Sequence, residues 1–435
     1  MKTTDGLNKT SIAQRTITRR GLLAATGAFG ATALAGPALA QNAIDDFLRN
    51  TKRGGLTNSF DGTAVTGGRE NIPNVGTNMP VFSQQVVGHL VAAIEEYRGI
   101  VSRGGWPVVP ANQKLRVGNV HPNVSILRQR LMISGDLPRS VGISDSFDTF
   151  VDQGLKRFQL RHGIPADGVA GEFTFAALNV SAPVRLGQLE TNLVRLRSMS
   201  GFLGDRYVMV NVPAQGIEVV EGDRVVSRHA AVVGKIDRQT PILNSKIHEM
   251  NINPYWTAPV SIVRKDIIPL MRKNAQYLVE NKIRVFDGQT EIDPVTIDWN
   301  TEEAVNYRFR QDPSRINAMG SVKINFPNPH AVYMHDTPQQ SLFSKLLRFE
   351  SSGCVRVANV RDMMVWLARD TPGWDRRTIE RTIESGDRID INLVEPVPVY
   401  FTYISAWSTG PGVVQFRDDI YQRDGVTELN IGTNI

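Results

Sequence analysis

HDTP at residues 335–338 and SSGCVR at residues 351–356 are the two stretches that decide the fold and the chemistry expected of this chain. Cys354 is the only cysteine among 435 residues. A thiol with an ordinary pKa of about 8.5 needs a nearby base to react at neutral pH, and an imidazole serves this purpose in many cysteine enzymes. The two stretches therefore predict Cys354 as a nucleophile and His335 as its base. A buried, unreactive cysteine is the alternative.

The residues before Cys354 are expected to form a tight turn. Ser351, Ser352 and Gly353 are small, and a helical pattern over residues 360–367 follows the cysteine. A turn that leads into a helix would expose the sulfur and direct free backbone N–H groups toward it. Such donors would lower the thiol pKa and could hold an oxyanion. Substrate contact is a second role for the two serines.

Hydrophobic periodicity divides the chain into a helical part and a mostly β part. Helices are predicted at residues 81–101, 124–133, 151–160, 171–178 and 186–199. From residue 205 onward, alternating β-branched residues predict strands at 207–212, 216–220, 224–226, 331–334, 389–393, 397–404 and 413–416. Helical and loop character over about 261–312 predicts an insertion that could lie over the active site. The expected fold class is a multidomain α+β protein.

The N-terminus has the features of an export signal. A basic stretch ends in Thr18-Arg19-Arg20, an apolar run covers residues 21–34, and Ala38-Leu39-Ala40 is a small-x-small cleavage site. The paired arginines favour the twin-arginine route over the general secretory one. We therefore expect residues 1–40 to be a signal peptide and the protein to reach the periplasm, associated with the cell wall.

Charge and hydropathy narrow the choice of partners. The formal net charge is +6, and residues 1–40 contribute five basic residues against one acidic residue, so the remainder carries +2. This charge is too small to indicate nucleic-acid binding. No later stretch has eighteen uninterrupted apolar residues, so no membrane span is expected after signal cleavage. Protein partners cannot be derived from the sequence.

One helical segment resembles a known module. Residues 115–180 carry a pattern similar to the three-helix peptidoglycan-binding module of cell-wall hydrolases, at Phe158-Gln159, Gly163, Asp167-Gly168, Gly171, Thr174 and Ala177-Leu178. A helical bundle that serves only as a spacer is the alternative. Around it we expect a flexible lead-in at 41–80, a helical scaffold at 81–114, a helical linker at 181–204, a catalytic domain at 205–425 and a tail at 426–435.

The C-terminal motifs resemble the catalytic domain of the L,D-transpeptidases (YkuD type). The similarity lies in Pro327-Asn328, in Tyr333-Met334-His335-Asp336-Thr337-Pro338 and in Ser352-Gly353-Cys354-Val355-Arg356. It is greatest to the large Gram-negative form, which has a helical scaffold, a peptidoglycan-binding module and a helical insertion. One departure is Ser352, where many relatives have histidine. His335 is therefore the only histidine within the motif.

The resemblance implies a reaction and a role for each motif residue. Cys354 would form a thioester with a peptidoglycan stem peptide, release D-Ala and pass the acyl group to an amine on the third residue of another stem. The backbone carbonyl of Asp336, or alternatively its side chain, would orient His335. Gly353 would shape the oxyanion loop, with the Cys354 N–H as donor. Arg356 would order the loop or bind a substrate carboxylate, and Tyr333 would line the pocket or the core. Acylation by carbapenems is also implied.

Other classes of function are disfavoured or remain as alternatives. Neither a His-Glu-x-x-His motif nor a Ser-x-x-Lys motif occurs, and the remaining histidines lack ligand spacing, so neither a metal nor a cofactor is expected. The same cysteine could instead serve an L,D-carboxypeptidase, a D-amino-acid exchanger or a ligase that joins lipoproteins to the wall. A non-catalytic wall-binding protein is the alternative from another class.

Overall fold

The computed structural model describes residues 77–199, 201 and 203–426. These residues belong to one compact unit, Asn50–Ile435. The predicted signal peptide at 1–40, most of the lead-in and nearly all of the tail lie outside the described residues. Within the described ranges, none of the helices combines the length and the hydropathy that a membrane span requires.

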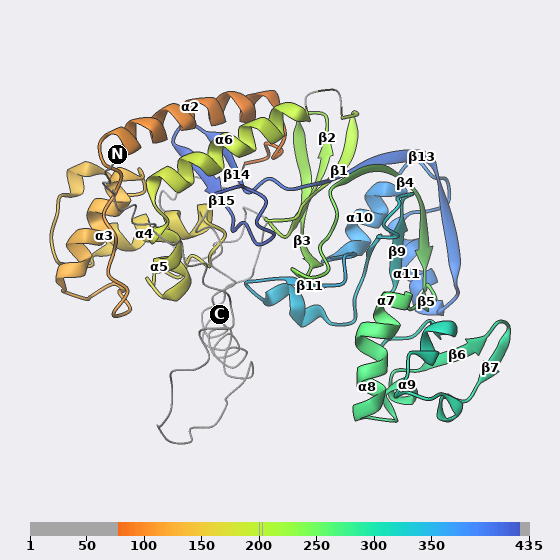
Figure 1. The fold of residues 1–435 in the computed structure, drawn as a ribbon. Coiled ribbons are helices and arrows are strands. Elements are labelled where there is room, and N and C mark those ends of the chain that lie inside the picture. The colour runs from red at the N-terminus through yellow and green to blue at the C-terminus, as the bar shows by residue number, and fades with distance from the viewer. Residues whose placement is uncertain (1–76, 200, 202, 427–435) are drawn as a thin grey trace, which may run out of the picture. The chain divides into compact units, whose positions relative to one another are not determined.

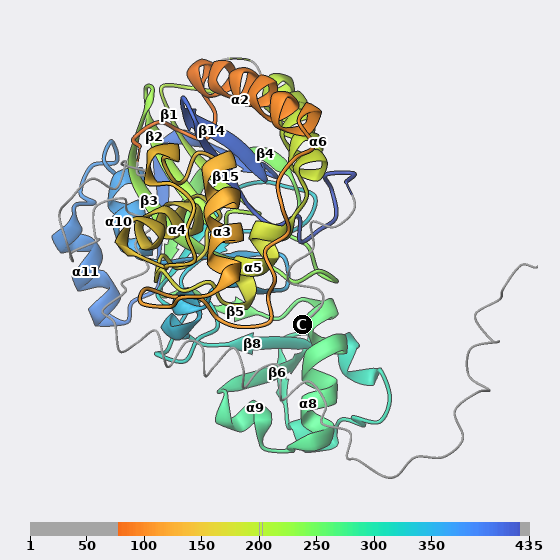
Figure 2. The same ribbon diagram turned by 90° about the vertical axis from the view of Figure 1, so that its left-hand side faces the viewer.

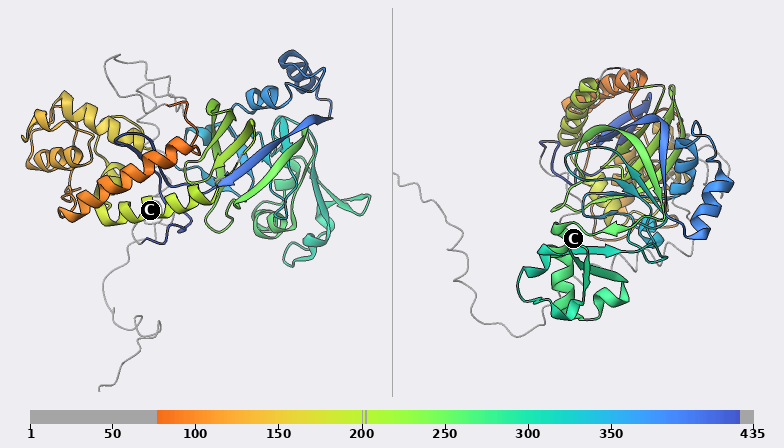
Figure 3. Two further views of the ribbon diagram at one scale, coloured as in Figure 1. Left: turned by 90° about the horizontal axis from the view of Figure 1, so that it is seen from above. Right: turned by 90° about the vertical axis from the view of Figure 1, so that its right-hand side faces the viewer.

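Two long helices pack against each other and against a small hairpin. They are α2 (Gln84–Ser102) and α6 (Ala182–Ser198), and the hairpin consists of β14 (Ala406–Gly410) and β15 (Val413–Phe416). Figure 1 shows the hairpin beside both helices, and the left view of Figure 3 shows the helices running side by side. Ser83 begins α2 by accepting a hydrogen bond from Val86 N–H. Apolar side chains of all four elements share one buried core.

The segment between these helices folds around a core of its own. It contains α3 (Pro122–Ile133), the 3-10 helix η2 (Arg139–Val141), α4 (Thr149–Arg161) and α5 (Glu172–Asn179), visible in Figure 2. Gln159 is fully buried, and its amide donates to Asp167, Thr174 and the Val169 carbonyl. Its Oε1 accepts from Gly168 N–H. This single amide thus holds the Gly-rich loop that connects α4 to α5.

A nine-stranded sheet forms the centre of the C-terminal part. Its order is β11-β3-β12-β10-β9-β4-β13-β1-β2, and because β2 also pairs with β3 the sheet closes on itself. The strands are β1 (Arg206–Asn211), β2 (Gly216–Glu221), β3 (Arg224–Gly234), β4 (Leu243–Ile252), β9 (Val322–Asn325), β10 (Met334–His335), β11 (Phe349–Ser351), β12 (Val355–Val357) and β13 (Ile389–Thr402). Two helices, α10 (Val360–Leu367) and α11 (Arg376–Ser385), add apolar side chains to its core.

The insertion between β4 and β9 has helices and a sheet. The sequence predicts helix and loop for residues 261–312, but the structure also contains a four-stranded sheet of order β5-β8-β6-β7 with a separate hydrophobic core. Alternating burial along β6 explains the strand, because Ile283 and Val285 face that core. The elements are β5 (Trp256–Thr257), α7 (Val260–Ile262), the π-helix η3 (Val263–Ile267), α8 (Ile268–Lys273), α9 (Tyr277–Glu280), β6 (Ile283–Asp287), β7 (Thr290–Ile292), β8 (Arg308–Gln311) and the 3-10 helices η4 (Pro294–Thr296) and η5 (Glu303–Asn306).

The strand predicted at residues 331–334 is wrong over most of its length. β10 contains only Met334–His335, and Ala331 has a positive φ of 52°. The cause is the side chain of Asn328, whose Oδ1 accepts from Val332 N–H while its Nδ2 donates to the Val332 carbonyl. An asparagine that bonds nearby backbone in this way stabilises a turn. The chain therefore enters β10 from a turn directly before the predicted base.

Candidate active site

Strand register places two of the predicted site residues, His335 and Arg356, side by side on the sheet. β10 and β12 are parallel neighbours in which Met334 pairs with Val355 and His335 with Arg356. Side chains alternate along a strand, so Met334 and Val355, both fully buried, face the core. The opposite face receives the side chains of His335 and Arg356, and Tyr333 and Cys354 directly precede the two strands.

The neighbouring strand adds a lysine to this face that sequence reasoning missed. Lys323 on β9 pairs with His335, and its Nζ lies 4.7 Å from the centroid of the Tyr333 ring. Burial raises the pKa of Cys354, and the positive charge of Lys323 is one of the smaller effects that oppose this rise. A turn-rich segment connects β9 to β10, and only the pairing of these two strands shows that Lys323 is a neighbour of His335. The local sequence around Lys323 carries no such signal.

His335 is held by the residue that follows it. Its ring is 7% exposed, and Nδ1 lies 2.5 Å from the carbonyl oxygen of Asp336. Because a carbonyl can only accept, Nδ1 carries the proton, and Nε2 of the neutral ring keeps its lone pair. Burial first, and then the charge of Arg356, lower the pKa of His335 to about 3. The imidazole is therefore neutral at pH 7 and able to accept a proton at Nε2.

The carboxylate of Asp336 is engaged away from the imidazole. Oδ2 accepts hydrogen bonds from the N–H and the hydroxyl of Ser321, at 2.9 and 2.7 Å, and Oδ1 accepts from Thr337 N–H at 2.7 Å. Of the two orienting groups considered for His335, the backbone carbonyl is thus the one in contact with the ring. The side chain instead fixes the backbone that carries this carbonyl.

The low pKa of His335 leads to a prediction about stability. An unfolded histidine has a pKa near 6.5, so between pH 6.5 and 3 the unfolded chain binds the proton that the folded chain excludes. The stabilising contribution is complete above pH 6.5 and is lost as the pH falls. At pH 5 the loss is about 2 kcal/mol. The free energy of unfolding, measured with urea, should fall between pH 7 and pH 5 by about 2 kcal/mol less in His335→Asn than in wild type.

A control for this prediction is available on β4. His248 is an exposed histidine, so His248→Asn should unfold with the wild-type pH dependence. An equal pH dependence in wild type and His335→Asn would contradict the burial of a neutral imidazole at position 335.

Cys354 lies in a different backbone context from the one predicted. The residue that follows it begins β12, and the helix α10 starts only at Val360. The buried β-branched residues Val355 and Val357 pair with β10 and β3, and this pairing takes the place of the expected helix start. The predicted lowering of the thiol pKa is also wrong, because burial raises the pKa of Cys354 above its ordinary value, and hydrogen bonding with Tyr333 offsets this only in part.

The loop before Cys354 is closed by the hydroxyl of Ser351. Ser351 is buried, its Oγ donates to the Cys354 carbonyl at 2.5 Å, and it accepts from Gly353 N–H at 3.2 Å. Gly353 has a φ of 112°, which a residue with a Cβ rarely adopts. The Cys354 N–H has no acceptor in the described part of the chain. The loop therefore presents a free backbone donor next to the sulfur.

Ser352 and Arg356, two further residues predicted for the site, form hydrogen bonds with neighbouring segments. Ser352 is exposed and accepts from Arg238, which also forms an ion pair with Asp266 of the insertion. Arg356 donates to the Gln339 side chain at 2.9 Å, on the loop that follows His335. This hydrogen bond joins the two motif segments, and both roles expected for Arg356, ordering the loop and binding a substrate carboxylate, stay predictions.

Tyr333 lies between the two predicted catalytic groups. The ring of Tyr333 stands edge-on to the His335 ring, with centroids 5.5 Å apart. Burial first, and then the neighbouring Cys354, raise the pKa of Tyr333. The hydrogen bonds of the described residues do not include one between the His335 imidazole and the Cys354 sulfur, and a direct link between them stays a prediction.

No group of three or more histidine, cysteine or carboxylate side chains suited to a metal ion occurs in residues 77–199, 201 and 203–426. The chemistry available at the described face is that of a thiol, a neutral imidazole, a phenol and two cations. Such a set can take a proton from the thiol and stabilise a negative charge as it develops.

Comparison with known proteins identifies two domains. Residues 205–391 match the family model described as the L,D-transpeptidase catalytic domain (YkuD), and residues 120–178 match the one described as "Putative peptidoglycan binding domain". A protein of Haemophilus influenzae named "Putative L,D-transpeptidase" is 30% identical over 248 residues, which are 56% of this chain and 50% of that protein. The chain thus spans about half the length of this curated relative.

Solved structures of low sequence identity are also similar over part of the chain. An L,D-transpeptidase from Stackebrandtia nassauensis is 15% identical with a TM-score of 0.24, over 68% of this chain and 96% of that one. An L,D-transpeptidase from Xylanimonas cellulosilytica is 17% identical with a TM-score of 0.22, over 67% and 99%. The assignment rests on the two family models. The chain therefore carries an L,D-transpeptidase catalytic domain at residues 205–391 and a peptidoglycan-binding domain at residues 120–178.

Proposed function

We propose that this protein is a peptidoglycan L,D-transpeptidase that works outside the cytoplasm and uses Cys354 as its nucleophile. The observation that carries the proposal is that Tyr333 contacts the His335 ring and hydrogen-bonds with Cys354, beside two parallel neighbouring strands within the matched catalytic domain. A thiol, a neutral base and a free N–H donor next to the thiol are the groups that acyl transfer requires.

In the first step the sulfur of Cys354 attacks the carbonyl carbon between the third and fourth residues of a donor tetrapeptide. Nε2 of His335 takes the thiol proton as the carbon–sulfur bond forms, and the Cys354 N–H donates to the developing oxyanion. The carbon–nitrogen bond then breaks, and the His335 imidazolium gives its proton to the departing amine of D-Ala. Because burial disfavours both a thiolate and an imidazolium here, we expect proton transfer to accompany the attack rather than precede it.

In the second step an amine on the third residue of another stem attacks the thioester. His335 accepts a proton from this amine, the new amide bond forms, and the carbon–sulfur bond breaks. The proton returns from His335 to the sulfur, so the enzyme ends as it began. The product is a cross-link between third residues, and neither a metal nor a cofactor takes part in this scheme.

The other parts of the chain fit this activity. The matched domain at residues 120–178, with α3, α4 and α5, would serve as a three-helix module that holds the enzyme on peptidoglycan. The predicted signal at residues 1–40 would deliver it to the periplasm. Since β-lactam opening by a thiol also passes through an oxyanion, carbapenems are expected to acylate Cys354.

Product analysis separates this proposal from its alternatives. We expect purified tetrapeptide muropeptides to give dimers that lack one D-Ala, measured by mass spectrometry. Tripeptides would indicate a carboxypeptidase. With added D-amino acid, a tetrapeptide with a new terminal residue would indicate exchange. With added lipoprotein, a stem joined to the lipoprotein would indicate ligation. Unchanged muropeptides with intact Cys354 would refute catalysis and favour a wall-binding protein.

Gly320 provides a test of how His335 is held. It has a φ of 60°, and a Cβ at this position would lie 2.5 Å from Oδ2 of Asp336. Gly320→Ala should therefore displace Asp336 and with it the carbonyl that holds the imidazole. We expect acylation of Cys354 by a carbapenem, followed by intact-protein mass, to slow by at least about tenfold.

A matched glycine controls for backbone strain. Gly288 has a φ of 56°, but a Cβ there would meet no atom within 4 Å. Gly288→Ala should lose about 1 kcal/mol of stability through strain alone, with acylation unchanged. If Gly320→Ala and Gly288→Ala were acylated equally fast, Asp336 would have no part in positioning the base.

A further inference from the structure

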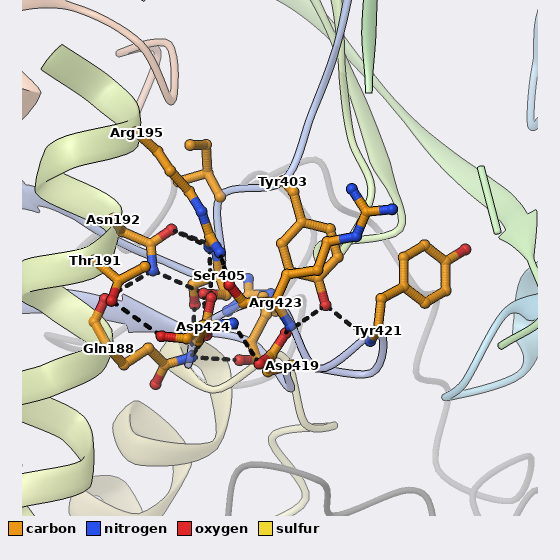
Figure 4. Close-up of polar contacts among 12 residues, drawn as sticks. Gln188, Thr191, Asn192, Arg195, Tyr403, Ser405, Asp419, Tyr421, Arg423 and Asp424 are labelled. Atoms are coloured by element: carbon orange, nitrogen blue, oxygen red, sulfur yellow. Dashed lines mark hydrogen bonds and ion pairs between the residues drawn. The ribbon is translucent and has the colours of Figure 1, made fainter. Parts of the chain in front are cut away.

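A buried polar network fastens the C-terminal segment to α6 (Figure 4). Asp424, whose side chain is fully buried, accepts from Ser405 at 2.6 Å and from Arg195 at 2.5 Å. Gln188 of α6 donates to the same carboxylate at 3.2 Å. Asp419 accepts from the Tyr403 hydroxyl at 2.7 Å. This segment lies beyond residue 391, where the match to the catalytic-domain model ends.

The network continues from this segment to the loop that carries Cys354. Tyr421 donates its N–H to the Tyr403 hydroxyl at 2.9 Å, and the two rings stack with centroids 5.7 Å apart. The Tyr421 hydroxyl donates to the Gly234 carbonyl at 2.5 Å and accepts from Thr240 N–H at 3.2 Å. The segment thus holds both ends of the turn that follows β3.

Thr240 makes the last link to the nucleophile. Its side chain is 1% exposed, its Oγ1 accepts from Gly234 N–H at 2.9 Å, and the same hydroxyl donates to the Gly353 carbonyl at 2.9 Å. The peptide that joins Gly353 to Cys354 is planar and trans, so its C=O and N–H point in opposite directions. Fixing the carbonyl on Thr240 therefore also fixes the direction of the Cys354 N–H.

We propose that Thr240 and Tyr421 are positioning residues, which hold the Gly353–Cys354 peptide so that the Cys354 N–H points to where the oxyanion forms. That N–H has no acceptor in the described part of the chain, as a donor reserved for substrate requires. Without the hydroxyl of Thr240, the Gly353 carbonyl loses this partner and the peptide is free to rotate. The inference rests on the proposed function, because an oxyanion arises only in acyl transfer.

Two reagents that react with the same sulfur separate positioning from general structure. Alkylation of Cys354 by iodoacetamide displaces iodide and forms no oxyanion, whereas acylation by a carbapenem forms one. We expect Thr240→Val to slow acylation about 100-fold and Tyr421→Phe to slow it about tenfold. Alkylation of both variants should stay within about twofold of wild type, because the thiol itself is not changed. Thr240→Ser keeps the hydroxyl and should restore acylation.

A tyrosine elsewhere in the sheet provides the matched control. Tyr400 on β13 donates its hydroxyl to the Leu203 carbonyl at 2.8 Å, so Tyr400→Phe also removes a tyrosine hydroxyl contact, away from this network. It should be acylated at the wild-type rate. Melting temperatures identify any variant that fails to fold. If Thr240→Val does not fold, Tyr421→Phe and Thr240→Ser still give the comparison.

The possible outcomes distinguish this inference from the proposed function. If wild type and both variants were acylated equally fast, or if alkylation slowed in parallel with acylation, the positioning role would be overturned and the proposed function would stand. If wild type were alkylated but never acylated, both would be overturned together.

Discussion

Cys354→Ala is expected to abolish the turnover of tetrapeptide muropeptides, with no dimer or tripeptide above the level of a protein-free control. The chain has no other cysteine, so no second thiol can take over the attack on the donor carbonyl. Loss of a nucleophile typically removes a factor of about 10⁶ in rate. Product formation, measured by mass spectrometry, checks this prediction.

The substitution should leave the fold intact. Cys354 is partly exposed, and alanine preserves the backbone on which the Ser351 hydroxyl closes the loop. The variant should therefore melt within a few degrees of wild type and bind purified sacculi equally well. Residual turnover in a folded Cys354→Ala protein would rule out the thioester mechanism.

His335→Asn is expected to slow acylation of Cys354 by about 10²–10⁴-fold, the usual contribution of a general base. Alkylation by iodoacetamide at the same pH should change far less. The reason is the burial of both groups, which lowers the pKa of His335 to about 3 and raises that of Cys354 above its ordinary value. A thiolate–imidazolium pair is then scarce before substrate arrives, and removing the imidazole changes the amount of thiolate little.

The same substitution five residues earlier provides the control. His330 is exposed and belongs to the turn that precedes β10, so His330→Asn should leave both reactions unchanged. If alkylation of His335→Asn fell as steeply as acylation, a preformed ion pair would be the better account of the site.

Elements set by local pattern could be predicted from the sequence. Apolar residues at helical spacing predicted the helix at residues 360–367, and the structure has α10 at Val360–Leu367. The strand predicted at 413–416 is β15. In α10 one face is buried and the other is not, so the helical periodicity is visible locally.

Features set by distant partners could not be predicted. The residue after Cys354 continues into a strand because β10 and β3 pair with it, and local sequence contains neither partner. Lys323 reaches the site through the register of β9. Thr240 and Tyr421 are 181 residues apart in sequence and meet at one hydrogen bond. The motif residues could be named because the two short motifs resemble those of a known family and contain the only cysteine, whereas the groups that surround and hold them come from the whole fold.

The most direct test of the central claim is to trap the acyl-enzyme and locate the acyl group. Wild-type protein mixed with a tetrapeptide donor and quenched in acid should gain the mass of the donor minus D-Ala. Proteolysis and peptide mapping should place this mass on the peptide that contains Cys354. Turnover with the acyl group on any other residue, or with no covalent adduct at all, would contradict the account.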